Sequence, residues 1–379
     1  MLASDSSSVL RTKPPIPART QIRSRFTAGV YACFAPGSRS RPNFAPGHKL
    51  SLNLIKMEVL RQMGRGWFKS HRDKGLKVET DSGGQDFFDV SANAAKPVPQ
   101  HLVIMVNGIN GSPADWRWAA EQFVKRLPEK VIIHRSECNS SRLTFDGVDT
   151  MGERLAEEVL SVVRRWPGVQ KISFVAHSLG GLIARYAIER LLDNSSTLEH
   201  CFSEEQTKDS AHYVKQYHEA KIAGLEPMNF ITVATPHLGS RGNKQLPLLC
   251  GLPFLERRAS QTAHLVAGRS GKHLFLMDNN DGKPPLLLRM ADDTNDLKFI
   301  SALRVFKRRV AYANANYDRI LYSEEMIRGL TQVPWERVDV SFQKSRQRYI
   351  AHITIQVKTY WLNSDGADVV FHMMDNFLL

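Results

Sequence analysis

The sequence contains little that would indicate a disulfide scaffold, a metal site or a membrane-spanning protein. Its 379 residues include only four cysteines, which are far apart and form no C-x-x-C pair: Cys33, Cys138, Cys201 and Cys250. Neither a disulfide framework nor a zinc site is indicated by this spacing, and free thiols fit a reducing compartment. No uninterrupted apolar run approaches the ~18 residues that suggest a membrane helix.

Acidic residues are scarce at the N-terminus, and this scarcity explains most of the net charge of +13. Residues 1–56 hold nine Lys or Arg and a single acid, Asp5, so they contribute +8 and leave +5 for the other 323 residues. The positive charge is therefore concentrated in one segment and does not describe a binding face. We expect no nucleic-acid partner, because such a partner needs a basic surface patch.

Residues 1–56 are rich in Ser, Arg and Pro and have no compact apolar core. This composition is typical of an organellar transit peptide, and we expect a chloroplast address. The alternative is a disordered basic tail on a cytoplasmic protein. Met57 is also a possible alternative start, which would remove the segment. Residues 57–97 form a variable linker region.

Strand-like and helix-like segments alternate from residue 98 onward, which predicts a parallel α/β sheet. A helix with Asp115 as its N-cap is expected to follow the first strand, and "TMGE" at 150–153 has the form of a capping box opening another helix. The segments that read as strands are "HLVIMV" at 101–106, "KVIIHR" at 130–135, "KISFVA" at 171–176, "MNFITVA" at 228–234, "RRVAYANANYD" at 308–318 and "RVDVSF" at 337–342.

The third of these strands runs into "AHSLG", where Ser178 has Ala176 two residues before it and Gly180 two residues after it. A serine on a sharp strand-to-helix corner, flanked by small residues, is a nucleophile elbow. The usual pattern has glycine at both flanking positions, so Ala176 is a departure by one methyl group. The alternative interpretation is an ordinary strand-to-helix turn with a solvated serine.

A glycine-rich loop, "NGINGSPADW", follows the first strand at 107–116. Acyl transfer to a serine needs two N–H donors for the oxyanion, one after the nucleophile and one from a loop after an early strand. These requirements predict the N–H groups of Leu179 and Ile109 as the oxyanion donors. An ordinary glycine-rich turn is the alternative.

Together, "HLVIMVNGINGSPADW", "RLTFDGVDTMGERLAEEV", "ISFVAHSLGGLIARYAI" and "ITVATPHLGS" resemble the putative serine esterase family of lipase-like α/β-hydrolases, with plant members nearest. The similarity spans about residues 98–379. It implies one α/β-hydrolase domain there, with a mostly parallel central sheet and helices on both faces. It also implies activity on carboxylic esters, with lipid acyl esters as substrates and no metal or organic cofactor.

The resemblance also implies where the partners of Ser178 lie. The acid follows the strand after "TPHLGS", which indicates Asp318, and the histidine follows the last strand, which indicates His352 in "AHITIQVK". His372 is the alternative base, in helix-like surroundings. Three other acids, Asp292, Asp293 and Asp296, precede a helix-like segment and are better interpreted as caps or surface charges.

The sequence therefore predicts a serine hydrolase that forms an acyl-enzyme on Ser178. Peripheral contact with a membrane or lipid surface is compatible with a lipid substrate. "QLPLLCGLPFLERR" at 245–258 is either a lid or acyl-chain surface, or a packed connection. Two rival functions remain: an acyltransferase or thioesterase on the same fold, and a non-catalytic binding protein, which Ala176 and the short connection after Asp318 leave open.

Overall fold

The computed structural model describes residues 20–26, 78–80, 86–89, 99–193, 220–240, 267–279, 282–294, 296–315 and 324–379. The Leu/Pro-rich stretch at 245–258 lies outside these ranges, so the choice between a lid and a packed connection stays open.

The described residues contribute nine strands to one sheet, in the order β1-β9-β8-β7-β6-β4-β5-β3-β2. Six adjacent strands are parallel to one another: β5, β4, β6, β7, β8 and β9. The strands β1, β2 and β3 pair antiparallel at the two edges of the sheet. The strands are β1 Gln21–Phe26, β2 Val78–Thr80, β3 Asp86–Asp89, β4 His101–Val106, β5 Val131–Arg135, β6 Lys171–His177, β7 Glu226–Val233, β8 Arg308–Asn314 and β9 Glu336–Ser341.

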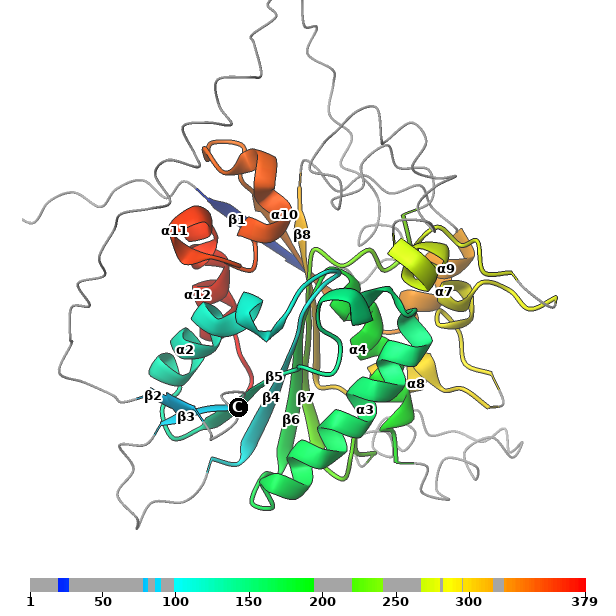
Figure 1. The fold of residues 1–379 in the computed structure, drawn as a ribbon, viewed down its shortest axis with the longest axis horizontal. Helices are drawn as coiled ribbons and strands as arrows, with labels where there is room; N and C mark the ends of the chain where they lie inside the picture. Colours follow the sequence, from blue (N-terminus) through cyan, green and yellow to red (C-terminus); the bar gives the residue numbers. More distant parts are fainter. Residues whose placement is uncertain are drawn as a thin grey trace, which may run out of the picture.

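Helices cover both faces of the sheet (Figure 1), and each face has its own apolar core. One core includes residues of α3, α4 and α8, and the other includes residues of α2, α10 and α12. No helix within the described ranges is long and apolar enough to span a bilayer. The α-helices are α2 Arg117–Arg126, α3 Val148–Arg165, α4 Leu179–Arg190, α7 Leu286–Arg289, α8 Phe299–Arg304, α9 Glu324–Leu330, α10 Ala351–Thr354, α11 Tyr360–Asn363 and α12 Ala367–Asp375.

The predicted α/β-hydrolase fold is confirmed. All residues of β4 and β5, and all but the first of β6 and β7, are buried. Burial on both faces explains why these strands read as continuous apolar runs. The chain order reverses direction between β4 and β6, and a crevice forms at such a switch point beyond the carboxyl ends of the strands. The elbow and the glycine-rich loop both follow these two strands, so the fold brings them together.

Two of the predicted helix starts are wrong. The helix expected to open with a capping box at Thr150 begins two residues earlier, at Val148, after Gly147 with a φ of 99°. Glu153 does not return to the helix start, because its carboxylate binds Arg190. Asp115 is not an N-cap either: it lies within a short 3-10 helix and pairs with Lys358 at 3.0 Å.

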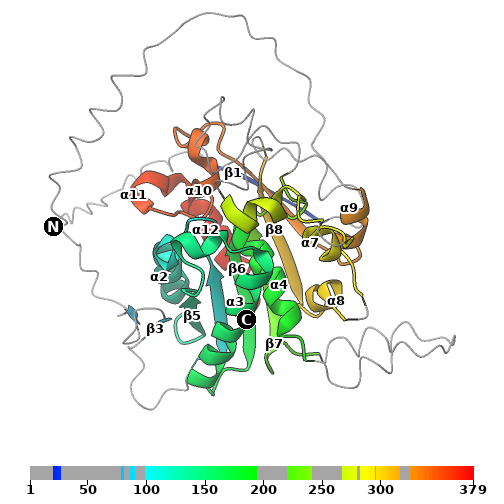
Figure 2. The ribbon, with the colours of Figure 1, turned by 45° about the vertical axis from the view of Figure 1, so that its right-hand side comes forward.

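Strand β1 falls within residues 1–56, the segment expected to be a targeting peptide or a disordered tail. Its six residues pair antiparallel with β9, from Gln21 opposite Ser341 to Phe26 opposite Glu336. Figure 2 shows this strand passing behind β8 and the C-terminal helices. At least this part of the segment therefore forms the outermost strand of the sheet.

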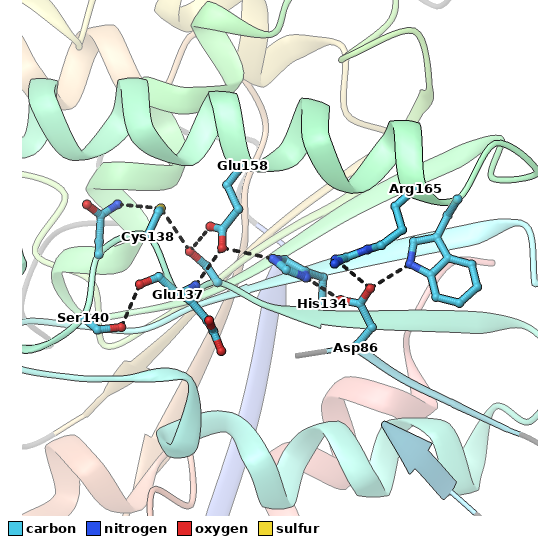
Figure 3. A network of polar contacts seen from close by, with 10 residues as sticks. Asp86, His134, Glu137, Cys138, Ser140, Glu158 and Arg165 are labelled. Carbon is cyan, nitrogen blue, oxygen red and sulfur yellow. Dashed lines mark hydrogen bonds and ion pairs between the residues drawn. The ribbon is translucent and has the colours of Figure 1, made fainter. Parts of the chain in front are cut away.

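A buried polar network joins β3, β5 and α3 (Figure 3). Nδ1 of His134 lies 2.5 Å from Asp86, and its Nε2 lies 3.2 Å from Glu158. The other oxygen of Asp86 accepts hydrogen bonds from Trp166 at 2.7 Å and pairs with Arg165 at 2.8 Å. A protonated His134 between two carboxylates thus fastens the margin of the sheet to α3.

This network predicts that folding stability falls at alkaline pH. Burial alone would lower the pKa of His134, but Asp86 and Glu158 outweigh it and raise the pKa to about 9. Because the pKa of His134 is higher in the folded state, its bound proton stabilises the fold fully below the ordinary pKa of 6.5. This stabilisation is lost as the pH rises through about 9. We expect the free energy of unfolding to drop by on the order of a few kcal/mol across that interval.

The measurement is urea unfolding of the purified protein at successive pH values from 6 to 10. Glu158→Gln should flatten this dependence, because it removes one of the two carboxylates that hold the proton on His134. An unfolding free energy that stays constant between pH 6 and 10 in the wild type would contradict a charged His134.

Candidate active site

Ser178 occupies the corner between β6, which ends at His177, and α4, which begins at Leu179. Its φ of 53° and ψ of −126° lie in a region that costs a non-glycine residue free energy. The Ser178 N–H donates to the carbonyl of Val233 on the neighbouring strand at 2.9 Å, which holds the corner in place. These are the backbone features of a nucleophile elbow.

The small residues around Ser178 are required by close backbone contacts. A Cβ on Gly180 would lie 2.5 Å from the carbonyl oxygen of Asn107, so only glycine fits there. Ala176 is fully buried and pairs with Val106 and Thr232 on the two neighbouring strands. The structure therefore accommodates the extra methyl group of Ala176 within the apolar core without opening the corner.

The glycine-rich loop passes directly against the elbow. A Cβ on Gly108 would lie 2.9 Å from Cβ of Ser178, so this position also needs glycine. In the loop, the N–H of Asn110 donates to Thr144 at 2.7 Å and that of Gly111 donates to Gly108 at 3.0 Å. The N–H of Ile109 has no hydrogen-bond acceptor among the described residues, and it remains available for a ligand.

The N–H of Leu179 likewise has no backbone acceptor within the part of the chain that the structure describes. It is the first residue of α4, where the helix dipole favours negative charge. The structure thus leaves unengaged the two N–H groups that the sequence predicted as oxyanion donors.

His352 lies beside Ser178, although 174 residues separate them in the chain. Its Nε2 is 2.9 Å from Oγ of Ser178, which is within hydrogen-bonding reach. Burial lowers the pKa of His352 to about 4, so the imidazole is neutral at physiological pH and can accept a proton. His352 is in α10, which follows β9, the last strand of the sheet.

Nδ1 of His352 is buried and has no hydrogen-bond partner among the described residues. An orienting acid would bind at this nitrogen, because it lies on the side of the ring opposite Ser178. The predicted acid, Asp318, lies outside the described residues, which resume at Glu324 after Ala315. The structure therefore leaves its position open.

His372, the alternative base, is not brought to Ser178. Its Nδ1 bonds to the hydroxyl of Tyr312 at 2.9 Å, and its Nε2 lies 3.4 Å from Oγ of Ser24. Of the three acids that were interpreted as caps or surface charges, Asp293 is a helix cap. Its carboxylate accepts hydrogen bonds from the N–H groups of Ile300 and Ser301 at the start of α8.

Two further residues brace the site through contacts that the sequence did not predict. Nε2 of His177 lies 2.7 Å from the carbonyl oxygen of His352, and the centroids of the two rings are 4.8 Å apart. The side-chain amide of Asn107 donates to the carbonyl oxygens of Gly108 and Asn139, which fixes the start of the glycine-rich loop. The contacts of His177 with His352 and of Asn107 with Asn139 join residues from different segments, so no local pattern reveals them.

The arrangement suits acyl transfer: a strained serine, a neutral imidazole at its hydroxyl and two N–H groups without acceptors in the described part of the chain. No cluster of three or more His, Cys, Asp or Glu side chains within the described ranges has the arrangement of a metal site.

A family model matches residues 96–324, and its description is "Putative serine esterase (DUF676)". The match covers more than half of the chain. The chain belongs to this family. The sequence-based assignment to a serine esterase family is thereby confirmed; the finer assignment to a plant-type member stays a prediction.

Curated relatives of this chain include proteins of two yeasts. The chain is 29% identical over 234 residues to "Putative lipase ROG1" of Saccharomyces cerevisiae, covering 60% of this chain and 29% of that protein. It is 27% identical over 231 residues to a putative lipase of Schizosaccharomyces pombe, covering 58% and 25%. The chain thus matches less than a third of the length of either relative.

Solved structures with a similar fold include the mature Bacillus licheniformis lipase BlEst2, at 18% identity and a TM-score of 0.30, covering 59% of this chain and 67% of that one. Another is the esterase rPPE, at 10% identity and a TM-score of 0.40, covering 81% and 86%. The fold assignment therefore rests on the strand order of this chain and not on these superpositions.

Proposed function

We propose that this protein is a carboxylic ester hydrolase that works through an acyl-enzyme on Ser178. The observation that carries the proposal is the 2.9 Å contact between Oγ of Ser178 and Nε2 of His352 at a strained strand-to-helix corner. Membership in a serine esterase family supports the same conclusion.

In the proposed mechanism, Ser178 attacks the ester carbonyl carbon while Nε2 of His352 takes the hydroxyl proton. The N–H groups of Ile109 and Leu179 bind the oxyanion of the tetrahedral intermediate. His352 then gives the proton to the leaving alcohol, and water hydrolyses the acyl-enzyme by the same steps. We assign Asp318 to Nδ1 of His352 because it follows β8 by four residues and Nδ1 has no described partner.

Labelling with a fluorophosphonate probe tests the proposal, because only an activated serine reacts with it. The wild type should be labelled and should also cleave short-chain nitrophenyl esters. Transfer of the acyl group to added alcohols or amines, measured in the same assay, separates hydrolysis from the acyltransferase alternative. A correctly folded protein that reacts with neither reagent would support the non-catalytic alternative.

We further propose lipid acyl esters as the substrate class, since the yeast relatives are described as putative lipases. Hydrolysis rates along a series of nitrophenyl esters test this proposal. A lipid hydrolase should favour chains longer than butyrate, whereas a small-ester hydrolase should favour acetate or butyrate.

The Ser- and Arg-rich composition of residues 1–56 supports a proposed plastid address, with a cytoplasmic location as the alternative. A fluorescent protein fused behind residues 1–60 should accumulate in plastids of plant cells. A matched fusion in which the Arg residues are replaced by Gln should remain in the cytosol, because the positive charge of a transit peptide is lost. Diffuse fluorescence from the unmodified fusion would leave only the tail interpretation.

A further inference from the structure

Exposed apolar side chains gather in the segment that carries His352. Among the described residues, eleven large apolar side chains are exposed, and five of them lie between residues 349 and 362. Tyr349 is 77% exposed and Trp361 is 67% exposed, although tryptophan is seldom so open to water. The five are Tyr349, Ile350, Tyr360, Trp361 and Leu362, and we call them the aromatic patch.

Hydrogen bonds connect the two segments that carry the aromatic patch. Gln347, just before Tyr349, accepts the N–H of Asp365 and lies within reach of Ser364. The amide of Asn363, just after Leu362, donates to Thr354 of α10 at 3.0 Å. Both views accordingly show α10 and α11 next to each other (Figures 1 and 2).

Side-chain contacts with α2 anchor the α11 part of the patch, so its exposure does not result from a loose end of the chain. Tyr360 stacks on Trp118 of α2, with ring centroids 5.0 Å apart and an interplanar angle of 18°. Lys358 anchors the preceding residues to Asp115 at 3.0 Å. The backbone of α11 is therefore fixed against α2 while Trp361 and Leu362 point into solvent.

Basic residues flank the aromatic patch in the sequence, and only Lys358 among them pairs with an acid, Asp115, within the described ranges. Between Asp339 and Asp365 the chain contains four basic residues and no Asp or Glu. Lys344 and Arg346 are exposed, and the guanidinium of Arg348 lies 4.4 Å over the ring of Tyr349. The four basic residues are Lys344, Arg346, Arg348 and Lys358.

From this combination we infer that the aromatic patch docks on an anionic lipid surface. Trp and Tyr favour the boundary between headgroups and acyl chains, and neighbouring Lys and Arg add attraction to anionic lipid. A symmetric contact with a second copy would bring the unpaired basic residues of both copies close together, which is unfavourable. The inference rests on the proposed function, because docking would bring Ser178 and His352 to an insoluble ester.

The test is co-sedimentation of the full chain with vesicles, which needs no catalysis. Vesicles of equal parts phosphatidylcholine and phosphatidylserine should bind the protein, and vesicles of phosphatidylcholine alone should bind it much more weakly. Raising the salt concentration should release it, since salt screens exposed charges. Ser178→Ala should bind as the wild type does, so failure of the catalytic proposal would not affect this result.

Two substitutions and one control connect binding to the patch. Trp361→Ser should lower the vesicle partition coefficient roughly tenfold, because an inserted side chain of this size contributes more than 1 kcal/mol. Arg346→Gln should lower it about fivefold on anionic vesicles only. Leu160→Ser, which removes an exposed apolar side chain from α3, should change neither value. Each variant is first checked for an unchanged thermal unfolding midpoint.

Equal binding to both kinds of vesicle, or binding that Trp361→Ser leaves intact, would overturn the inference. So would self-association of the wild type without lipid that Trp361→Ser abolishes, because the patch would then contact a second copy.

Discussion

Replacement of Ser178 by alanine is expected to reduce ester turnover by on the order of 10⁶ while the protein stays folded. The loss is large because no other group can form the acyl-enzyme at the elbow, where His352 lies 2.9 Å from the missing oxygen. Turnover of a short-chain nitrophenyl ester and labelling by a fluorophosphonate are the two measurements. Both should be lost together.

Ser161→Ala is the matched control, because Ser161 is exposed on α3 and makes no contact with the site. It should keep the wild-type rate and the wild-type unfolding midpoint. If Ser178→Ala keeps the wild-type turnover, Ser178 is not the nucleophile and the mechanism proposed above is wrong.

A similar loss, of about 10⁶, is expected for His352→Ala, since triad members act as a unit. His372→Ala should leave turnover unchanged, because the ring of His372 bonds to Tyr312 and Ser24 and not to Ser178. It should lower stability by about 1 kcal/mol through the lost hydrogen bond. Both variants are compared in one ester assay and one denaturant titration, which show whether each histidine acts as the catalytic base or as a packing residue.

The acid limb of the pH–rate profile gives a second readout on His352. Burial lowers the pKa of this imidazole, so the base stays unprotonated below the ordinary pKa of 6.5.

The opposite outcome for the two variants, in which His372→Ala abolishes turnover and His352→Ala keeps it, would mean that the catalytic base has been assigned to the wrong histidine.

The central strands could be predicted from the sequence because they are buried on both faces. "HLVIMV" and "KISFVA" are runs of apolar residues that a doubly covered parallel strand requires. Marginal strands carry no such signal. In β1, "QIRSRF", polar side chains predominate, and the strand forms because the edge of β9, far along the chain, offers backbone partners from Glu336 to Ser341.

The candidate site divides in the same way. Ser178 and Gly180 could be predicted because the corner itself demands small residues within a few positions. The contact between His177 and the carbonyl of His352 could not, because it depends on how the last strand and α10 pack on the elbow. The predicted helix starts were also wrong, because Glu153 and Asp115 form ion pairs with residues distant in the chain instead of capping a helix.

Strand β1 has a consequence for how the chain can be shortened. A peptidase that cut at residue 56, or translation from Met57, would remove Gln21–Phe26 and leave the outer backbone groups of β9 without partners. Uncovered strand edges recruit strands from other molecules. A processing site ahead of Gln21 would avoid this hazard. A chain expressed from residue 57 onward should accordingly be more prone to oligomerise than the full chain.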